Sequence, residues 1–105
     1  EKQLTTGLAG ADLTKVTIGY EPVWAIGPGK TPPGKEYMEM IGKHIKKVMG
    51  DVDVVYGGGL KKENAAMVSS VAELDGGLIA LTRFQGEIGF YPEEYLEIID
   101  KYMGE

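Results

Sequence analysis

The sequence has no cysteine among its 105 residues, so disulfide bonds and thiolate metal sites are excluded. It also has no apolar run that approaches the ~20 residues of a membrane-spanning helix, and we expect no membrane segment. The N-terminus lacks the pattern of a signal peptide. These three absences fit a cytoplasmic protein, and we expect that location.

Positive charge is scarce as well. The chain has 11 Lys and Arg residues against 16 Asp and Glu residues, which gives a net charge of −5. Surfaces for nucleic acid or anionic membrane need clustered cations, so we expect neither partner. The length allows one small domain at most. Because the sequence begins abruptly at Glu1 without an initiator methionine, we expect a piece cut from a longer chain.

Three short apolar runs alternate with helix-like segments. We predict strands at residues 16–20, 52–56 and 78–81 and helices at residues 1–8, 32–49, 62–71 and from 92 onward. The strands show little polar alternation, which is typical of parallel strands that are buried on both faces. The predicted fold class is therefore α/β, with three parallel strand–helix units preceded by a helix.

Two of the predicted helices have a clear apolar face. Between residues 32 and 49 the apolar residues recur at three- and four-residue steps, and Gly50 is a plausible C-terminal stop. The last helix opens with Pro92, followed by two acidic residues that suit its positive N-terminal end. We expect the buried side of this last helix to comprise Tyr95, Leu96, Ile98, Ile99 and Tyr102.

Three strands cannot close a barrel, and an open sheet of three strands would leave much apolar surface uncovered. Two interpretations of the pattern remain. One is a compact three-layer α/β domain. The other is a part of a larger fold.

The segment around Glu21 carries the most information about function. Glu21 stands at the carboxyl end of the apolar run 16–20 and precedes an apolar loop that contains Trp24, the only tryptophan of the chain. A surface turn would more often be polar. The layout suits a general base at a strand tip beneath a loop that can swing. The structural alternative is an ordinary surface carboxylate at the end of a strand.

Three motifs resemble the triosephosphate isomerase family. Residues 20–31 (YEPVWAIGPGKT) resemble its catalytic loop, residues 56–59 (YGGG) its next phosphate loop, and residues 75–81 (DGGLIAL) its last strand. They occur in the family's order and at about its intervals. The resemblance covers only the family's C-terminal portion, which implies a partial (β/α)8 TIM barrel. Residues 1–105 would then be the C-terminal part of a single TIM-barrel domain.

The resemblance implies an aldose–ketose isomerase that interconverts dihydroxyacetone phosphate and glyceraldehyde 3-phosphate by proton transfer. Glu21 would be the catalytic base, and enclosure by the loop would strip its water and raise its basicity. The substrate would be a small phosphorylated sugar, and no cofactor or metal is implied. The parent protein would be a homodimer.

The resemblance also assigns binding and hinge residues. Backbone N–H groups of Gly27, Gly59, Ala80 and Leu81 would cradle the substrate phosphate. The structural alternative for residues 57–59 is an ordinary glycine turn. The two hinges of the catalytic loop would be Pro22, Val23 and Trp24 on one side and Lys30, Thr31 and Pro32 on the other.

Several positions depart from the family pattern. Gly59 replaces a serine, and Pro32 replaces an alanine whose N–H would meet the Tyr56 phenol in the closed loop. Ala80 and Leu81 replace two glycines. Arg83 replaces a further serine, and the chain from there to Pro92 is longer than usual. Arg83 would either grip the phosphate as a bidentate donor or pair with a nearby carboxylate such as Glu87.

These departures leave alternatives open for the function. A tetrulose phosphate such as erythrulose phosphate is an alternative substrate. The family's asparagine–lysine segment and electrophilic histidine belong to its N-terminal half, and His44 reads as a solvated or packing residue. We therefore expect this chain alone to be inactive. A different class of function is a self-associating α/β module that binds phosphorylated ligands without catalysis.

Overall fold

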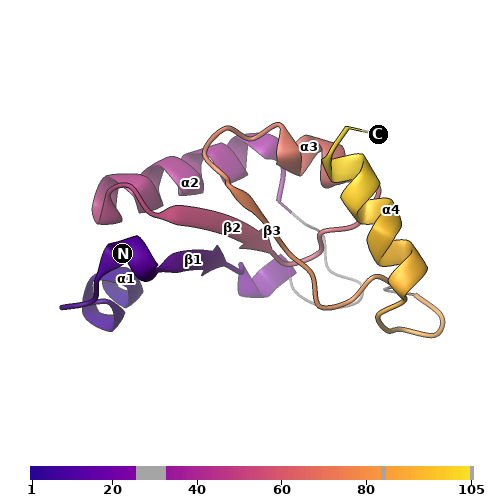
Figure 1. The fold of residues 1–105 in the computed structure, drawn as a ribbon, viewed down its shortest axis with the longest axis horizontal. Helices are drawn as coiled ribbons and strands as arrows, with labels where there is room; N and C mark the ends of the chain where they lie inside the picture. Colours follow the sequence, from indigo (N-terminus) through magenta and orange to yellow (C-terminus); the bar gives the residue numbers. More distant parts are fainter. Residues whose placement is uncertain (26–32, 84, 105) are drawn as a thin grey trace.

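The computed structural model describes residues 1–25, 33–83 and 85–104. Helices and strands alternate along these residues (Figure 1). Two short 3-10 turns, η1 (Leu13–Lys15) and η2 (Val23–Ala25), flank the first strand. The other elements, in chain order, are α1 (Lys2–Gly7), β1 (Thr17–Tyr20), α2 (Lys35–Met49), β2 (Asp53–Gly57), α3 (Ala65–Ser69), β3 (Gly76–Leu78) and α4 (Pro92–Tyr102).

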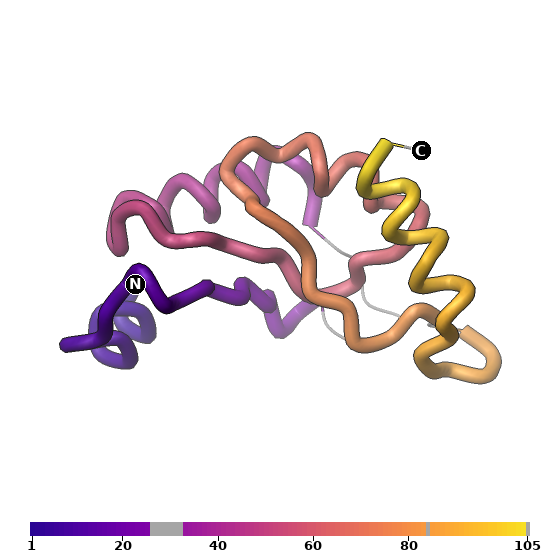
Figure 2. The backbone as a smooth tube through the Cα atoms, in the orientation of Figure 1, coloured from indigo at the N-terminus to yellow at the C-terminus, as the bar shows by residue number. Residues whose placement is uncertain are grey.

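The three strands form one parallel sheet in the order β1-β2-β3. Tyr20 of β1 is opposite Tyr56 of β2, and Gly57 of β2 is opposite Leu78 of β3. The carboxyl ends of the three strands therefore meet at one edge of the sheet. The molecule is elongated, with extents of 43 × 25 × 25 Å, and its termini lie toward opposite ends (Figure 2). This is a partial TIM-barrel-like α/β unit, as the sequence predicts.

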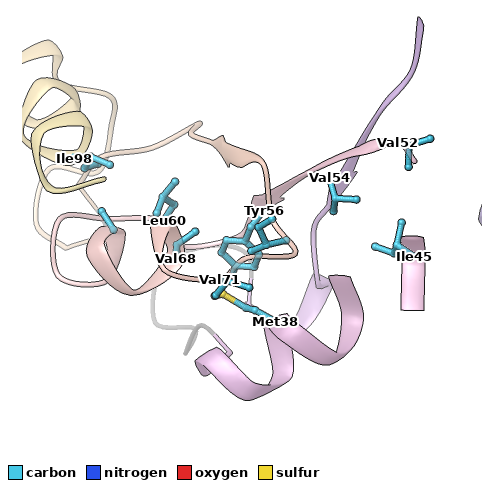
Figure 3. Close-up of a cluster of buried hydrophobic side chains, with 11 residues drawn as sticks. Met38, Ile45, Val52, Val54, Tyr56, Leu60, Val68, Val71 and Ile98 are labelled. Carbon is cyan, nitrogen blue, oxygen red and sulfur yellow. The ribbon is translucent and has the colours of Figure 1, made fainter. Parts of the chain in front are cut away.

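The core lies on one face of the sheet. Val54 and Tyr56 alternate with outward residues along β2, and both are fully buried. Figure 3 shows Tyr56 in the middle of the cluster, between residues of α2 on one side and Leu60, Val68 and Ile98 on the other. The opposite face of the sheet carries exposed residues such as Thr17 and Asp53. The expectation that both faces are buried is therefore wrong for the described residues, which cover only one.

Helix α2 has a glycine where it meets the segment that follows α3. Met38 and Ile45 face inward, as the periodicity predicts. A side chain at Gly42 would place its Cβ 2.7 Å from the Cβ of Glu73 and 3.3 Å from its carbonyl oxygen. The helix ends at Gly50, whose φ of 84° lies in the left-handed region that glycine tolerates.

The third strand lies earlier than the sequence predicts, at Gly76–Leu78 rather than 78–81. Its start is fixed by Asp75, whose backbone N–H donates to the Val54 carbonyl at 2.7 Å. Pairing with β2 then begins at Gly76 and Gly77, which have no side chains and therefore fit closely beside β2. A Cβ at Gly76 would lie 3.3 Å from Cγ1 of Val55. Ala80 and Leu81 consequently follow the strand and are not part of it.

Helix α4 leaves most of its apolar side uncovered. Ile98 is buried against the core and Tyr102 is partly buried, but Leu96 is 60% exposed. Tyr95 and Ile99 are exposed as well, so the predicted buried side is wrong for three of its five residues. The reason is that α3 is the main neighbour of α4 among the described helices and strands, and it covers only part of this side.

Candidate functional site

Glu21 lies where the carboxyl ends of the strands meet. A Cβ at Gly57 would stand 3.0 Å from Cγ of Glu21 and 3.4 Å from Cβ of Leu78. Glu21 follows β1, while Gly57 and Leu78 are the last residues of β2 and β3. Three segments that are far apart in the sequence therefore come together, and the missing side chain at Gly57 makes room for the carboxylate-bearing residue.

The Glu21 side chain is exposed in this arrangement. Among the residues that the structure describes, it forms no ion pair or side-chain hydrogen bond. The predicted tip of the loop, with Gly27, and the second hinge, Lys30, Thr31 and Pro32, lie outside the described residues. The predicted enclosure of the carboxylate therefore stays a prediction.

The first predicted hinge is a short 3-10 turn. The Ala25 amide donates to the Pro22 carbonyl at 2.8 Å, and both residues are buried. Val23 and Trp24 point outward, with Trp24 49% exposed. This turn holds the chain close to the sheet immediately after Glu21.

A tyrosine on α2 contacts the residues on either side of Glu21. The Tyr37 ring lies edge-on to Trp24, with ring centroids 5.5 Å apart. Its hydroxyl is 3.3 Å from the Tyr20 hydroxyl. Burial raises the pKa of the Tyr20 phenol above its ordinary value, and the hydrogen bond with Tyr37 adds to the rise. The apolar periodicity of residues 32–49 does not predict this contact, because it does not show which segment the helix meets.

The glycine turn after β2 depends on its residue type. Gly58 and Gly59 have φ values of 113° and 88°, which side chains disfavour. The Tyr56 hydroxyl donates to the Gly58 carbonyl, and burial raises the pKa of Tyr56 to about 12. The Asn64 amide group donates to the Gly59 carbonyl at 2.9 Å. Two side chains thus hold the turn through its carbonyl groups.

The connection after β3 folds back on itself. Both Thr82 and Arg83 amides donate to the Gly89 carbonyl at 3.0 Å, and the Gly89 amide donates to Arg83 at 3.2 Å. The Thr82 hydroxyl accepts from the Tyr91 amide at 2.7 Å. Figure 1 shows this connection as the orange loop beside the start of α4. Ala80 is exposed and Leu81 partly buried at the base of this connection.

Arg83 pairs with a carboxylate, and the partner is Glu94 rather than Glu87. Nη2 and Nε of Arg83 lie 2.7 and 2.9 Å from the same Glu94 oxygen. The guanidinium carbon is 3.8 Å from the centre of the Tyr91 ring. The hydrogen bond to Glu94 raises the pKa of Arg83 above its ordinary value. Glu87 instead contributes its carbonyl, which accepts from the Tyr91 hydroxyl at 2.7 Å.

A pocket of about 410 Å³ opens beside Arg83, and no pattern in the sequence predicts it. Its lining comes from the segment before α3, from the connection after β3 and from α4, and comprises Lys61, Lys62, Glu63, Thr82, Arg83, Gln85, Glu94 and Ile98. The adjacent lysines were the available signal, but their pattern alone reads as a solvated helix start.

The described residues offer few other candidate sites. No group of three or more His, Asp or Glu side chains among them could hold a metal ion. Within the same residues no helix combines the length and the apolar character needed to cross a membrane. Nε2 of His44 lies 3.5 Å from a carboxylate oxygen of Glu1 on the surface, as expected for a solvated residue.

Comparison with known proteins gives one consistent family. The family model for triosephosphate isomerase matches residues 1–101. A triosephosphate isomerase of Flavobacterium johnsoniae is 40% identical over 90 residues, which cover 75% of this chain and 36% of the relative. One of Treponema denticola is 39% identical over 110 residues, covering 93% and 41%. The chain thus spans about two fifths of the length of these relatives.

Proposed function

The chain belongs to the triosephosphate isomerase family, and on that basis we propose that it carries the catalytic base and the phosphate-binding end of an aldose–ketose isomerase. The proposed reaction interconverts dihydroxyacetone phosphate and glyceraldehyde 3-phosphate. The observation that supports it best is the position of Glu21, beside Gly57 and close to Leu78 at the joint carboxyl edge of the sheet. Active sites of barrel enzymes form at this edge.

The proposed role of Glu21 is to move a proton between neighbouring carbons. Its carboxylate would take the proton from the hydroxyl-bearing carbon next to the carbonyl group, which leaves an enediolate. A proton passes from the hydroxyl oxygen to the former carbonyl oxygen, and the Glu21 carboxylic acid returns its own proton to the former carbonyl carbon. An exposed carboxylate is a weak base in water. We therefore propose that residues beyond those described enclose Glu21 during the reaction and increase its basicity.

The proposed phosphate cradle consists of backbone N–H groups of Gly27, Gly59, Ala80 and Leu81. The glycine turn supports this assignment, because Gly58 and Gly59 hold left-handed conformations that let the backbone approach an anion closely. Its carbonyl groups are engaged by Tyr56 and Asn64, which keeps the turn in one conformation. Ala80 follows β3 at the same edge.

A tetrulose phosphate is the second candidate substrate. The observation that favours it is the rebuilt connection after β3, which closes through the Arg83–Gly89 bridge. An altered anchor for the phosphate would admit a longer sugar while Glu21 performs the same transfer. Assay of the whole protein with glyceraldehyde 3-phosphate and with erythrulose phosphate separates the two. Robust turnover of the triose alone would exclude the longer substrate.

Substitution of Glu21 tests the central assignment. In the whole protein that contains this segment, Glu21→Gln should lower kcat/KM by roughly 10²–10⁴, the usual worth of a positioned general base. Glu36→Gln, in the exposed first turn of α2, is the matched control and should leave the rate unchanged. A Glu21→Gln protein with undiminished turnover would refute the proposal.

The chain by itself should show almost no turnover, since the family's histidine and asparagine–lysine segment belong to its N-terminal half. The competing proposal of a non-catalytic, self-associating module predicts a discrete dimer in size-exclusion chromatography and phosphate binding that is indifferent to Glu21→Gln. Residence in the cytoplasm and a homodimeric whole enzyme are further proposals, and they rest on the family resemblance alone.

A further inference from the structure

The pocket beside Arg83 adjoins the proposed phosphate cradle, since Thr82 follows Leu81 directly, but it has its own lining. None of its lining residues is Glu21, Gly57, Leu78 or one of the proposed cradle residues. Its volume of about 410 Å³ lies within the range of about 300–1,000 Å³ that is usual for small-molecule sites. The buried side chain of Ile98 lies at its wall and links it to the hydrophobic core.

The charge of the pocket differs from that of the whole chain. Three cations, Lys61, Lys62 and Arg83, stand against two carboxylates in the lining, while the chain as a whole is net negative. Two of these cations are paired, Arg83 with Glu94 and Lys62 with Glu97 outside the lining. The lysines precede α3 and the arginine follows β3, so the three cations meet only through folding. A solvated helix face would not gather charges from two separate connections.

Arg83 is held in a fixed orientation through one edge of its guanidinium group. Its Nε–Nη2 edge bonds Glu94, and the Tyr91 ring lies against the guanidinium plane. A guanidinium group has a second edge, formed by Nη1 and Nη2, that can bind an oxyanion. Within the described residues no partner occupies Nη1.

We propose that this pocket is a second anion site that binds a phosphate group through the free edge of Arg83, with Lys61 and Lys62 as further cations. The inference does not depend on the proposed isomerase activity. The phosphate group can belong to a sugar phosphate or be free inorganic phosphate. Glu94 has a double effect, because it orients Arg83 and also repels an entering anion.

Calorimetric titration of the chain with inorganic phosphate at low salt tests the proposal. Saturable binding in the millimolar range is expected, and Arg83→Gln should weaken it at least tenfold. Glu94→Gln should tighten it severalfold, because glutamine keeps an acceptor for Arg83 and removes the opposing charge. Opposite effects of the two variants cannot arise from loss of the fold. Equal affinity of the Arg83→Gln chain would overturn the proposal.

A pair of lysine substitutions controls for diffuse charge. Lys62→Gln should weaken phosphate binding, although less than Arg83→Gln because Lys62 also pairs with Glu97 at 3.4 Å. Lys47→Gln, at the exposed end of α2 and outside the pocket, should leave it unchanged. Equal losses in both variants would mean that only the overall charge matters, which contradicts a built site.

Amide chemical shifts in the presence of phosphate separate this site from the proposed cradle. Shifts at Lys62, Arg83 and Glu94 support the pocket, whatever the result at Gly57–Gly59 and Leu81. Shifts confined to the latter residues would support the cradle and overturn the pocket. Titration with glycerol phosphate then shows whether the bound phosphate belongs to a larger ligand. If the pocket binds the phosphate group of a sugar-like molecule, the chemical shifts of the same pocket amides change. If these chemical shifts change only with inorganic phosphate, the ligand is the free anion.

Discussion

The Asp75 carboxylate accepts a hydrogen bond from the Val54 amide at 2.9 Å. The same oxygen lies 2.9 Å from the Lys46 ammonium group, and the Asp75 amide donates back to the Val54 carbonyl. One residue thus joins the start of β3 to β2 and α2. The Val54 hydrogen bond is the main reason that the pKa of Asp75 lies below its ordinary value of 3.8, and Lys46 lowers it further.

Asp75→Asn should destabilise the chain at neutral pH by about 1–2 kcal/mol, the usual worth of a hydrogen bond to a charged group at a partly exposed position. A folded-state pKa below the unfolded value stabilises the protein above pH 3.8, and this contribution disappears as pH falls through the folded-state pKa. Urea unfolding at pH 7 and pH 3 measures the difference, which should shrink at pH 3. Asp100→Asn on exposed α4 is the control, and a loss independent of pH would contradict the explanation.

Gly42→Ala should destabilise the chain although alanine is the better helix former. The added methyl group would lie 2.7 Å from Cβ of Glu73, and that atom cannot swing away without its backbone. Overpacking of this kind costs about 1–3 kcal/mol, more than the gain of about 1 kcal/mol from helix propensity. Thermal unfolding followed by circular dichroism measures the change. Gly7→Ala in α1, with open space around it, should be neutral or stabilising.

Tyr37→Ala should change the fluorescence of Trp24, the only tryptophan in the chain. Loss of the edge-on ring exposes more of the indole, so the emission should shift to longer wavelength and acrylamide quenching should increase. Tyr95→Ala removes a ring that contacts Phe90 and serves as the control. Unchanged emission in Tyr37→Ala would mean that Tyr37 does not restrain the first hinge.

Gly57→Ala should lower the proposed isomerase activity of the whole protein without unfolding it. The new methyl group would stand 3.0 Å from Cγ of Glu21, so the proposed base must move by a few tenths of an ångström. A misplacement of about 1 Å can reduce a rate about 100-fold, so a loss of roughly tenfold in kcat is expected. Steady-state kinetics measure it, with Gly19→Ala, which has open space, as the comparison. Equal kcat in both variants would contradict the contact's importance.

The sequence predicted those parts of the fold whose pattern is local. The three- and four-residue steps of α2 placed Met38 and Ile45 inward, and both are buried. The strand after Asp75 was misplaced because its bounds depend on pairing with Val54 and Val55, not on its own apolar residues. The sequence correctly predicted a helix with an apolar side at α4. It could not predict that this side stays largely exposed, because the pattern does not show whether a neighbouring element covers it.

In the candidate site, too, the sequence predicted the local feature but not the contacts between distant segments. The motif around Glu21 predicted a carboxylate at a strand end, and the structure places that residue against Gly57. Its catalytic role stays a prediction. The pocket with Lys62 and Arg83 could not be foreseen, because these residues lie 21 positions apart in the sequence and only the parallel pairing of β2 with β3 brings the segments after the two strands together.

The Arg83–Gly89 bridge and the bond from Tyr91 to Thr82 fasten both ends of the connection before α4. A residue inserted beside Gly86, which has open space around it, would therefore lengthen the tip while these bonds keep the start of α4 and Glu94 in place. Such a closed stem separates the tip from the sheet, and it marks a position where a short peptide tag should be tolerated.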